Sequence, residues 1–123
     1  MAIRVTSAEE FKKLIESTRD NNTCIVVEWR AEWCGACKTA GEYTQTLPSS
    51  HPELTFVTAD ADDIPEVAKA CGVKALPTIM AFKDGKKVEE FLGVCQQATL
   101  AMLGRCRGGD GNGGVCPVHR AAK

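Results

Sequence analysis

The feature that most constrains this chain is a regular alternation of strand-like and helix-like patterns. Residues 24–29 are mostly apolar and β-branched, which is typical of a strand buried on both faces. Residues 54–59 and 78–82 have the same apolar character, and helical spacing of apolar residues separates these runs. Strands that alternate with helices predict an α/β fold, in which helices cover both faces of a central sheet.

The expected elements follow the order β, α, β, α, β, α, β, β, α. A first helix begins at the capping box of Ser7 and Glu10, continues to about Thr18 and is broken over residues 20–22. Further helices are expected from the Cys34–Cys37 segment to about Thr46, where residues 47–50 end it, and over residues 64–70 and 98–103.

The remaining expected elements are short strands and one hairpin. An edge strand contains Ile3 and Val5. Near the other end, Asp84 and Gly85 form the centre of a hairpin turn that leads into a strand over residues 88–92.

The length of 123 residues fits one domain. We place this domain at residues 1–104. Residues 105–123 are rich in glycine, and we expect them to form a flexible tail that carries Cys106 and Cys116.

The charge of the chain and the distribution of its apolar residues argue against nucleic acids and membranes as partners. The formal net charge is −1 and no cluster of lysine and arginine is evident, so nucleic-acid binding is not expected. No window approaches the roughly 18 apolar residues that a membrane span needs. The first residues are too polar for a secretory signal. We therefore expect a cytoplasmic protein in a reducing compartment.

Cys34 and Cys37 lie where a strand is expected to end and a helix to begin. The unpaired N–H groups and the dipole at a helix start stabilise a thiolate, which is the attacking species in disulfide exchange. The spacing places both sulfurs on one helix face, within reach of a disulfide. Cys34, the outer residue, is the expected nucleophile, and Cys37 the resolving cysteine. Gly35 lets a substrate backbone approach. Half of a zinc site, or two unrelated core thiols, remain alternatives.

With its flanking residues this motif resembles the thioredoxin family over about residues 3–103. The resemblance rests on residues 26–38 (VVEWRAEWCGACK), 73–78 (VKALPT) and 82–85 (FKDG), and on Gly93. It implies a thioredoxin fold, with a mixed five-stranded sheet and four helices, and reversible disulfide exchange with proteins. It further implies a cis Leu76–Pro77 peptide beside the cysteines. The substrate-binding residues that the resemblance implies are Trp33, Gly35, Ala36, Leu76, Pro77 and Gly93.

The chain departs from the family pattern near the cysteines. Ala36 replaces the usual proline, so we expect a shifted redox potential of open direction. Glu28 replaces a buried aspartate; burial would raise its pKa and make it a proton acceptor for Cys37, the alternative being a polar residue at a strand end. Some members bury a lysine near this acid, but Thr58 stands at that position, so no such lysine is evident here. Arg30 replaces an aromatic residue and is expected to be an ordinary exposed arginine; the alternatives are a larger positive potential beside the site and selection of acidic partners.

The chain contains seven cysteines. We expect Cys24 to be structural and Cys95 inert, and regulation through Cys71 is an alternative to a passive thiol. The tail is expected to be passive. Alternatives are a disulfide between Cys106 and Cys116, or a zinc site of His119 with cysteines.

The sequence thus predicts a protein-disulfide reductase that serves electron transport and cell redox homeostasis. No bound cofactor or metal is expected. The expected partners are protein disulfides and an NADPH-dependent thioredoxin reductase, with ferredoxin- or glutathione-linked donors as alternatives, and the chain is expected to be a monomer. The alternative function is a binding or redox-regulatory module with little turnover.

Overall fold

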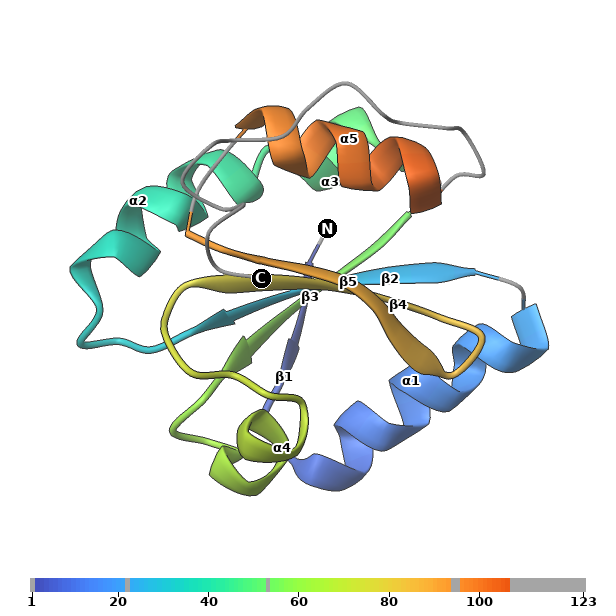
Figure 1. The fold of residues 1–123 in the computed structure, drawn as a ribbon, viewed down its shortest axis with the longest axis horizontal. Coiled ribbons are helices and arrows are strands. Elements are labelled where there is room, and N and C mark those ends of the chain that lie inside the picture. The colour runs from blue at the N-terminus through green and yellow to red at the C-terminus, as the bar shows by residue number, and fades with distance from the viewer. Residues whose placement is uncertain (1, 22, 53, 94–95, 107–123) are drawn as a thin grey trace.

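A five-stranded mixed sheet lies between two layers of helices (Figure 1). The computed structural model describes residues 2–21, 23–52, 54–93 and 96–106. Its elements are β1 (Ala2–Val5), α1 (Ala8–Asn21), β2 (Cys24–Arg30), α2 (Gly35–Thr44), α3 (Leu47–Ser50), β3 (Thr55–Asp60), α4 (Pro65–Ala70), β4 (Thr78–Lys83), β5 (Lys86–Leu92) and α5 (Gln96–Cys106).

The strand order is β1-β3-β2-β4-β5. Both β1 and β2 pair with β3 in parallel, whereas β4 pairs with β2 and with β5 in antiparallel fashion. The predicted mixed five-stranded sheet is therefore confirmed. The strand that leads into the cysteine motif, β2, lies at the centre of this sheet and is hydrogen-bonded on both sides.

The helices cover opposite faces of the sheet. In Figure 1, α1 and α4 lie below the sheet, whereas α2, α3 and α5 lie above it. Side chains alternate between the two faces along a strand. Val27 and Trp29 of β2 accordingly pack with α1 and α4, and Val26 packs with α3 and α5. Below the sheet, the ring of Phe11 lies 5.4 Å from that of Trp29.

Helix α1 begins directly after Ser7, as the capping box predicts. Ser7 Oγ accepts a hydrogen bond from the Glu10 amide at 3.1 Å. The predicted end near Thr18 is wrong, because the helix continues to Asn21. Thr18 is fully buried, donates to the Ile15 carbonyl at 2.6 Å and accepts from the Gly85 amide at 2.7 Å. This contact fixes the last turn of α1 against the β4–β5 hairpin and outweighs the weak helix propensity of Asp20 and Asn21.

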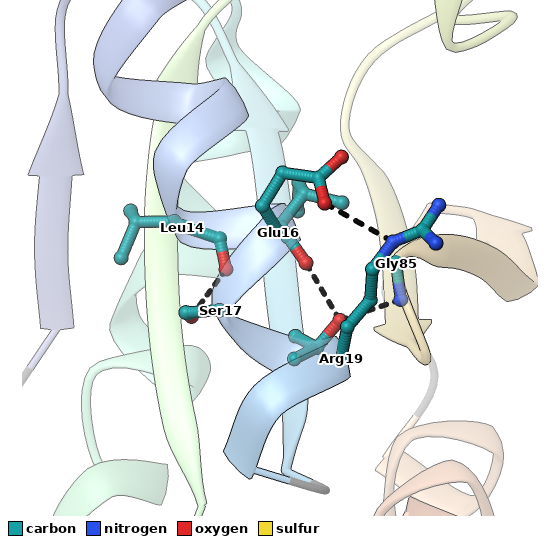
Figure 2. A network of polar contacts seen from close by, with 7 residues as sticks. Leu14, Glu16, Ser17, Arg19 and Gly85 are labelled. Carbon is teal, nitrogen blue, oxygen red and sulfur yellow. Dashed lines mark hydrogen bonds and ion pairs between the residues drawn. The ribbon is translucent and has the colours of Figure 1, made fainter.

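Figure 2 shows the same junction from close by. Arg19 forms an ion pair with Glu16 at 3.1 Å and lies over Gly85, where a side-chain carbon would collide with it. The predicted turn is confirmed, because Asp84 and Gly85 have φ values of 56° and 79°, the left-handed pair that a two-residue hairpin requires.

Three other boundaries differ from the expected ones. Residues 47–50, predicted only to end a helix, form the short helix α3 in addition to the four predicted helices. The hairpin strand β5 begins at Lys86, and α5 spans Gln96–Cys106. The predicted tail lies almost entirely outside the described residues. Among the helices described, none has the length and apolar character that crossing a membrane demands.

Candidate active site

Cys34 and Cys37 lie at the junction of β2 and α2, as predicted. Cys34 is the N-cap of α2, and its Sγ accepts a hydrogen bond from the Cys37 amide at 3.2 Å. Both are free thiols. Cys34 is 7% exposed and Cys37 is 0% exposed, so the outer and inner positions are also those expected.

The surroundings of Cys37 disfavour its thiolate. Burial, together with the hydrogen bond to Cys34, raises the pKa of the Cys37 thiol to about 11. The backbone of Ala31 and the charge of Arg30 act in the opposite direction. Cys37 is therefore a thiol at neutral pH and needs a proton acceptor before it can act as a nucleophile.

A second loop lies against the two cysteines. The Leu76–Pro77 peptide is cis, in agreement with the prediction. Leu76 packs against the buried cluster of Ala31, Cys34 and Cys37. The Gly93 amide donates to the Pro77 carbonyl at 2.7 Å. Three segments that are distant in sequence therefore meet at one end of the sheet.

Trp33 projects from this site. It is 72% exposed, and its indole N–H donates to Asp62 Oδ2 at 2.8 Å. Asp62 is itself held by a hydrogen bond from its amide to Asp60 Oδ1. Trp33 and Leu76 both line a shallow hollow of about 300 Å³. Sequence reasoning did not identify Asp62 as the partner of Trp33.

Glu28 is buried on the α2 side of the sheet. It is 7% exposed, and its Oε1 accepts from Thr44 Oγ1 at 2.9 Å, whereas its Oε2 has no partner among the described residues. Burial raises the pKa of this carboxyl, as expected, and Thr44 and Arg30 oppose the shift. Sequence reasoning missed Thr44. Its position two helical turns after Cys37 is the signal that identifies it.

Glu28 also lines a cavity of about 410 Å³ between β2, β3 and α2. Thr58, the register partner of Glu28 on β3, lines it as well. Arg30, the third polar residue of this wall, is half-buried, and its charge lowers the pKa of both Glu28 and Cys37. The expectation of an ordinary exposed arginine is therefore wrong, and Arg30 supplies Glu28 with a charge from a different position than the lysine of some family members.

The other cysteines lie apart from this pair. Cys24 is buried and disulfide-bonded, in keeping with a structural role. Cys71 is a half-buried free thiol whose pKa is raised by burial. Within the described residues, no group of three His, Cys, Asp or Glu side chains could hold a metal ion. The predictions for Cys95, Cys106, Cys116 and His119 concern side chains that are not described.

The chain is similar to known proteins over almost all of its described length. The family model for thioredoxin matches residues 2–103. Thioredoxin Asp f 29 of Aspergillus fumigatus is 38% identical over 102 residues, which is 81% of this chain and 90% of that protein. Mitochondrial thioredoxin-3 of Saccharomyces cerevisiae is 34% identical over 90 residues, which is 73% of this chain and 68% of that protein.

Solved structures agree with these similarities. The crystal structure of Fasciola hepatica thioredoxin superposes with a TM-score of 0.78 at 31% identity, covering 85% of this chain and 98% of that one. The matched region includes the sheet, the cysteine junction and the cis peptide. The chain therefore belongs to the thioredoxin family, whose members are thiol–disulfide oxidoreductases.

Proposed function

We propose that this chain is a protein-disulfide reductase that works through a dithiol–disulfide cycle of Cys34 and Cys37. The observation that supports it best is the placement of two free thiols at a helix start, with the inner amide bonded to the outer sulfur at 3.2 Å. That arrangement allows the outer sulfur to react with a substrate and the inner one to follow within the same site.

The first half of the cycle forms a mixed disulfide. The Cys34 thiolate attacks one sulfur of the substrate disulfide, and the other substrate sulfur leaves as a thiolate that takes up a proton. In the second half, the Cys37 thiol loses its proton and attacks Cys34 Sγ. The Cys34–Cys37 bond forms, the bond to the substrate breaks, and the second substrate sulfur leaves and is protonated. Two electrons have then passed from the dithiol to the substrate.

Glu28 is the proposed proton acceptor for Cys37. Its carboxyl is buried, its pKa is raised and one of its oxygens has no described partner. A carboxyl tuned in this way is suited to exchanging a proton near neutral pH. Since Glu28 also lines the cavity, a water molecule held there is a suitable carrier of the proton between sulfur and carboxylate.

The substrate is proposed to bind across the segments that meet at the site. The backbone of Leu76 would pair with an extended segment of the substrate, which suits many partners because backbone is generic. The exposed ring of Trp33 would cover the apolar part of that segment. The other proposed contacts are Gly35, Ala36, Pro77 and Gly93.

The proposed partners are protein disulfides as substrates and an NADPH-dependent thioredoxin reductase as the source of electrons. No tightly bound cofactor is needed, because the electrons pass through the two sulfurs. We further propose that the protein acts as a monomer in the cytoplasm, although one of its relatives is a mitochondrial protein. The potential of the pair is proposed to depend on Ala36, and Ala36→Pro tests this by a change in its equilibrium with dithiothreitol.

Reduction of insulin with dithiothreitol as electron donor tests the proposal. The wild-type protein is expected to accelerate it, and Cys34→Ser is expected to lose all acceleration. Cys37→Ser should accumulate mixed disulfides with substrate proteins, because the resolving sulfur is missing. If neither the wild-type protein nor the variants accelerate the reaction, and a partner remains bound when both cysteines are replaced, the chain is a binding module instead.

A further inference from the structure

Arg30 lines the cavity beside Glu28, a location that the sequence alone does not predict. It is the last residue of β2, two positions after Glu28, so both side chains leave the same face of the sheet. Both line the same cavity. Arg30 is half-buried, and its guanidinium lies against α2 at Gly41, where a side-chain carbon would come within 3.5 Å of Nη1. A glycine at this point of α2 leaves space for the guanidinium.

The charged groups around this cavity come from two elements. Glu28 and Arg30 come from β2, and Lys38 and Glu42 from α2. Lys38 and Glu42 are exposed and of opposite sign, so solvent screens them and their effects oppose each other. The residues that β3, β4 and α5 contribute to the lining are uncharged, namely Phe56, Val57, Thr58, Ile79 and Thr99. Among the described residues that line this cavity, Arg30 is therefore the one cation that is half-buried.

We propose that Arg30 is a positioning residue for the resolving half of the cycle, and that its guanidinium stabilises the negative charge as it moves from Glu28 to Cys37. This inference rests on the function proposed above. When the Cys37 proton passes to the Glu28 carboxylate, the negative charge moves from oxygen to sulfur. Because Arg30 shares the cavity with Glu28 and its charge also acts on Cys37, it stabilises the negative charge in either place, and the transfer does not create an unpaired charge in a buried site.

The electrostatics of the two groups, Glu28 as the acceptor and Cys37 as the donor of the proton, agree with this placement. The charge of Arg30 lowers the pKa of Glu28 and also that of Cys37. Without Arg30, burial alone would keep a larger fraction of Glu28 protonated at neutral pH, and a protonated carboxyl cannot take the proton of Cys37. Loss of Arg30 should therefore move the acid limb of the resolving step to higher pH.

The experiment separates the two halves of the cycle with Ellman's reagent as the disulfide. Attack by Cys34 releases one coloured thiolate, and resolution by Cys37 releases the second, so rapid mixing gives two phases. We expect Arg30→Gln to slow the second phase at neutral pH by about three- to tenfold, the size expected from removing a partly screened charge. The slowing should shrink as the pH rises.

Three further measurements distinguish electrostatics from packing. Arg30→Lys keeps the charge and should retain most of the wild-type rate, whereas a packing role would be lost in both variants. Lys12 is an exposed residue of α1. Lys12→Gln changes the net charge by the same amount as Arg30→Gln and should leave the second phase unchanged. The carbon resonance of the Glu28 carboxyl should titrate at higher pH in Arg30→Gln than in the wild-type protein.

The outcomes separate this inference from the proposed function. If the wild-type protein shows a second phase, and that of Arg30→Gln coincides with it across the pH range, the role of Arg30 is overturned and the cycle stands. If the wild-type protein shows no second phase, the cycle fails and the role of Arg30 fails with it.

Discussion

The two faces of the sheet are filled very differently. On the side of α1 and α4, the rings of Phe11, Trp29 and Phe82 pack edge to face or tilted, with centroids 5.4 and 5.7 Å apart. On the side of α2, a buried carboxyl and a cavity of about 410 Å³ interrupt the core. Both faces are built from the same strands, so the difference comes from the alternation of side chains along β2.

This contrast shows how one small domain combines stability with chemistry. Close packing of apolar groups gains dispersion energy and leaves no room for a proton carrier. A partly filled face loses some of that energy but has room for Glu28 and Arg30, which both line the cavity. Each face also buries one polar atom that has no described hydrogen-bond partner, namely Glu28 Oε2 on the α2 side and the indole N–H of Trp29 on the α1 side.

The largest expected effect comes from adding one methylene to each face in turn. Val26 and Val27 are neighbours in β2, but Val26 lines the cavity and Val27 belongs to the core with Trp29. We expect Val27→Ile to lower the free energy of unfolding by about 1–3 kcal/mol, because the filled face must shift to accept it. Val26→Ile should leave it unchanged or raise it by up to about 1 kcal/mol. Urea unfolding measures both, and equal losses would mean that the two faces are equally packed.

A smaller effect is expected from Glu28→Gln, measured as urea stability against pH. The pKa of Glu28 is raised above its ordinary value of 4.5, so the native state holds this proton more tightly than the unfolded state. The protonated carboxyl therefore contributes its full stabilisation below pH 4.5, and this stabilisation is lost as the pH rises through the pKa of Glu28 in the folded protein. Glu28→Gln should remove this fall and be more stable than the wild-type protein at neutral pH by about 1 kcal/mol, while slowing disulfide reduction.

Glu42→Gln is the matched control, because Glu42 lines the same cavity but is exposed. It should keep the wild-type slope of stability against pH. An unchanged slope in Glu28→Gln would mean that the carboxyl is solvated in solution.

The smallest effect concerns Gly41, in the interior of α2. Glycine in a helix costs about 0.5–1 kcal/mol relative to alanine, and the 3.5 Å approach to Arg30 is ordinary contact. Gly41→Ala should therefore raise the free energy of unfolding by about 0.5–1 kcal/mol with little change in turnover. Gly85→Ala, at positive φ beneath Arg19, should lower it. A loss of turnover in Gly41→Ala would mean that the contact with Arg30 tolerates no methyl group.

The parts of the fold that obey local rules were accessible from the sequence. The capping box of Ser7, the Asp84–Gly85 turn and the strand that leads into Cys34 each depend on residues close together in the chain. The cis Leu76–Pro77 peptide was accessible only through the family resemblance, since local rules favour trans.

The parts that sequence reasoning missed depend on contacts between distant segments. The extra turn of α1 is held by Gly85, the carboxyl of Glu28 by Thr44, and the indole of Trp33 by Asp62. The guanidinium of the half-buried Arg30 likewise lies close to Gly41, which belongs to a different element. Neither propensity nor periodicity identifies these partners, because nothing in the type of each residue distinguishes it before the fold brings the two segments together.

The outer strand β5 carries a last consequence. An edge strand offers unpaired backbone groups on which another extended chain can add and begin an aggregate. Four of the seven residues of β5 are charged, namely Lys86, Lys87, Glu89 and Glu90. Lys87 pairs with Glu90 and also donates to the Cys71 carbonyl at 2.9 Å, which ties the edge to the end of α4. The charges and the tether together discourage another extended chain from lengthening the sheet at this edge.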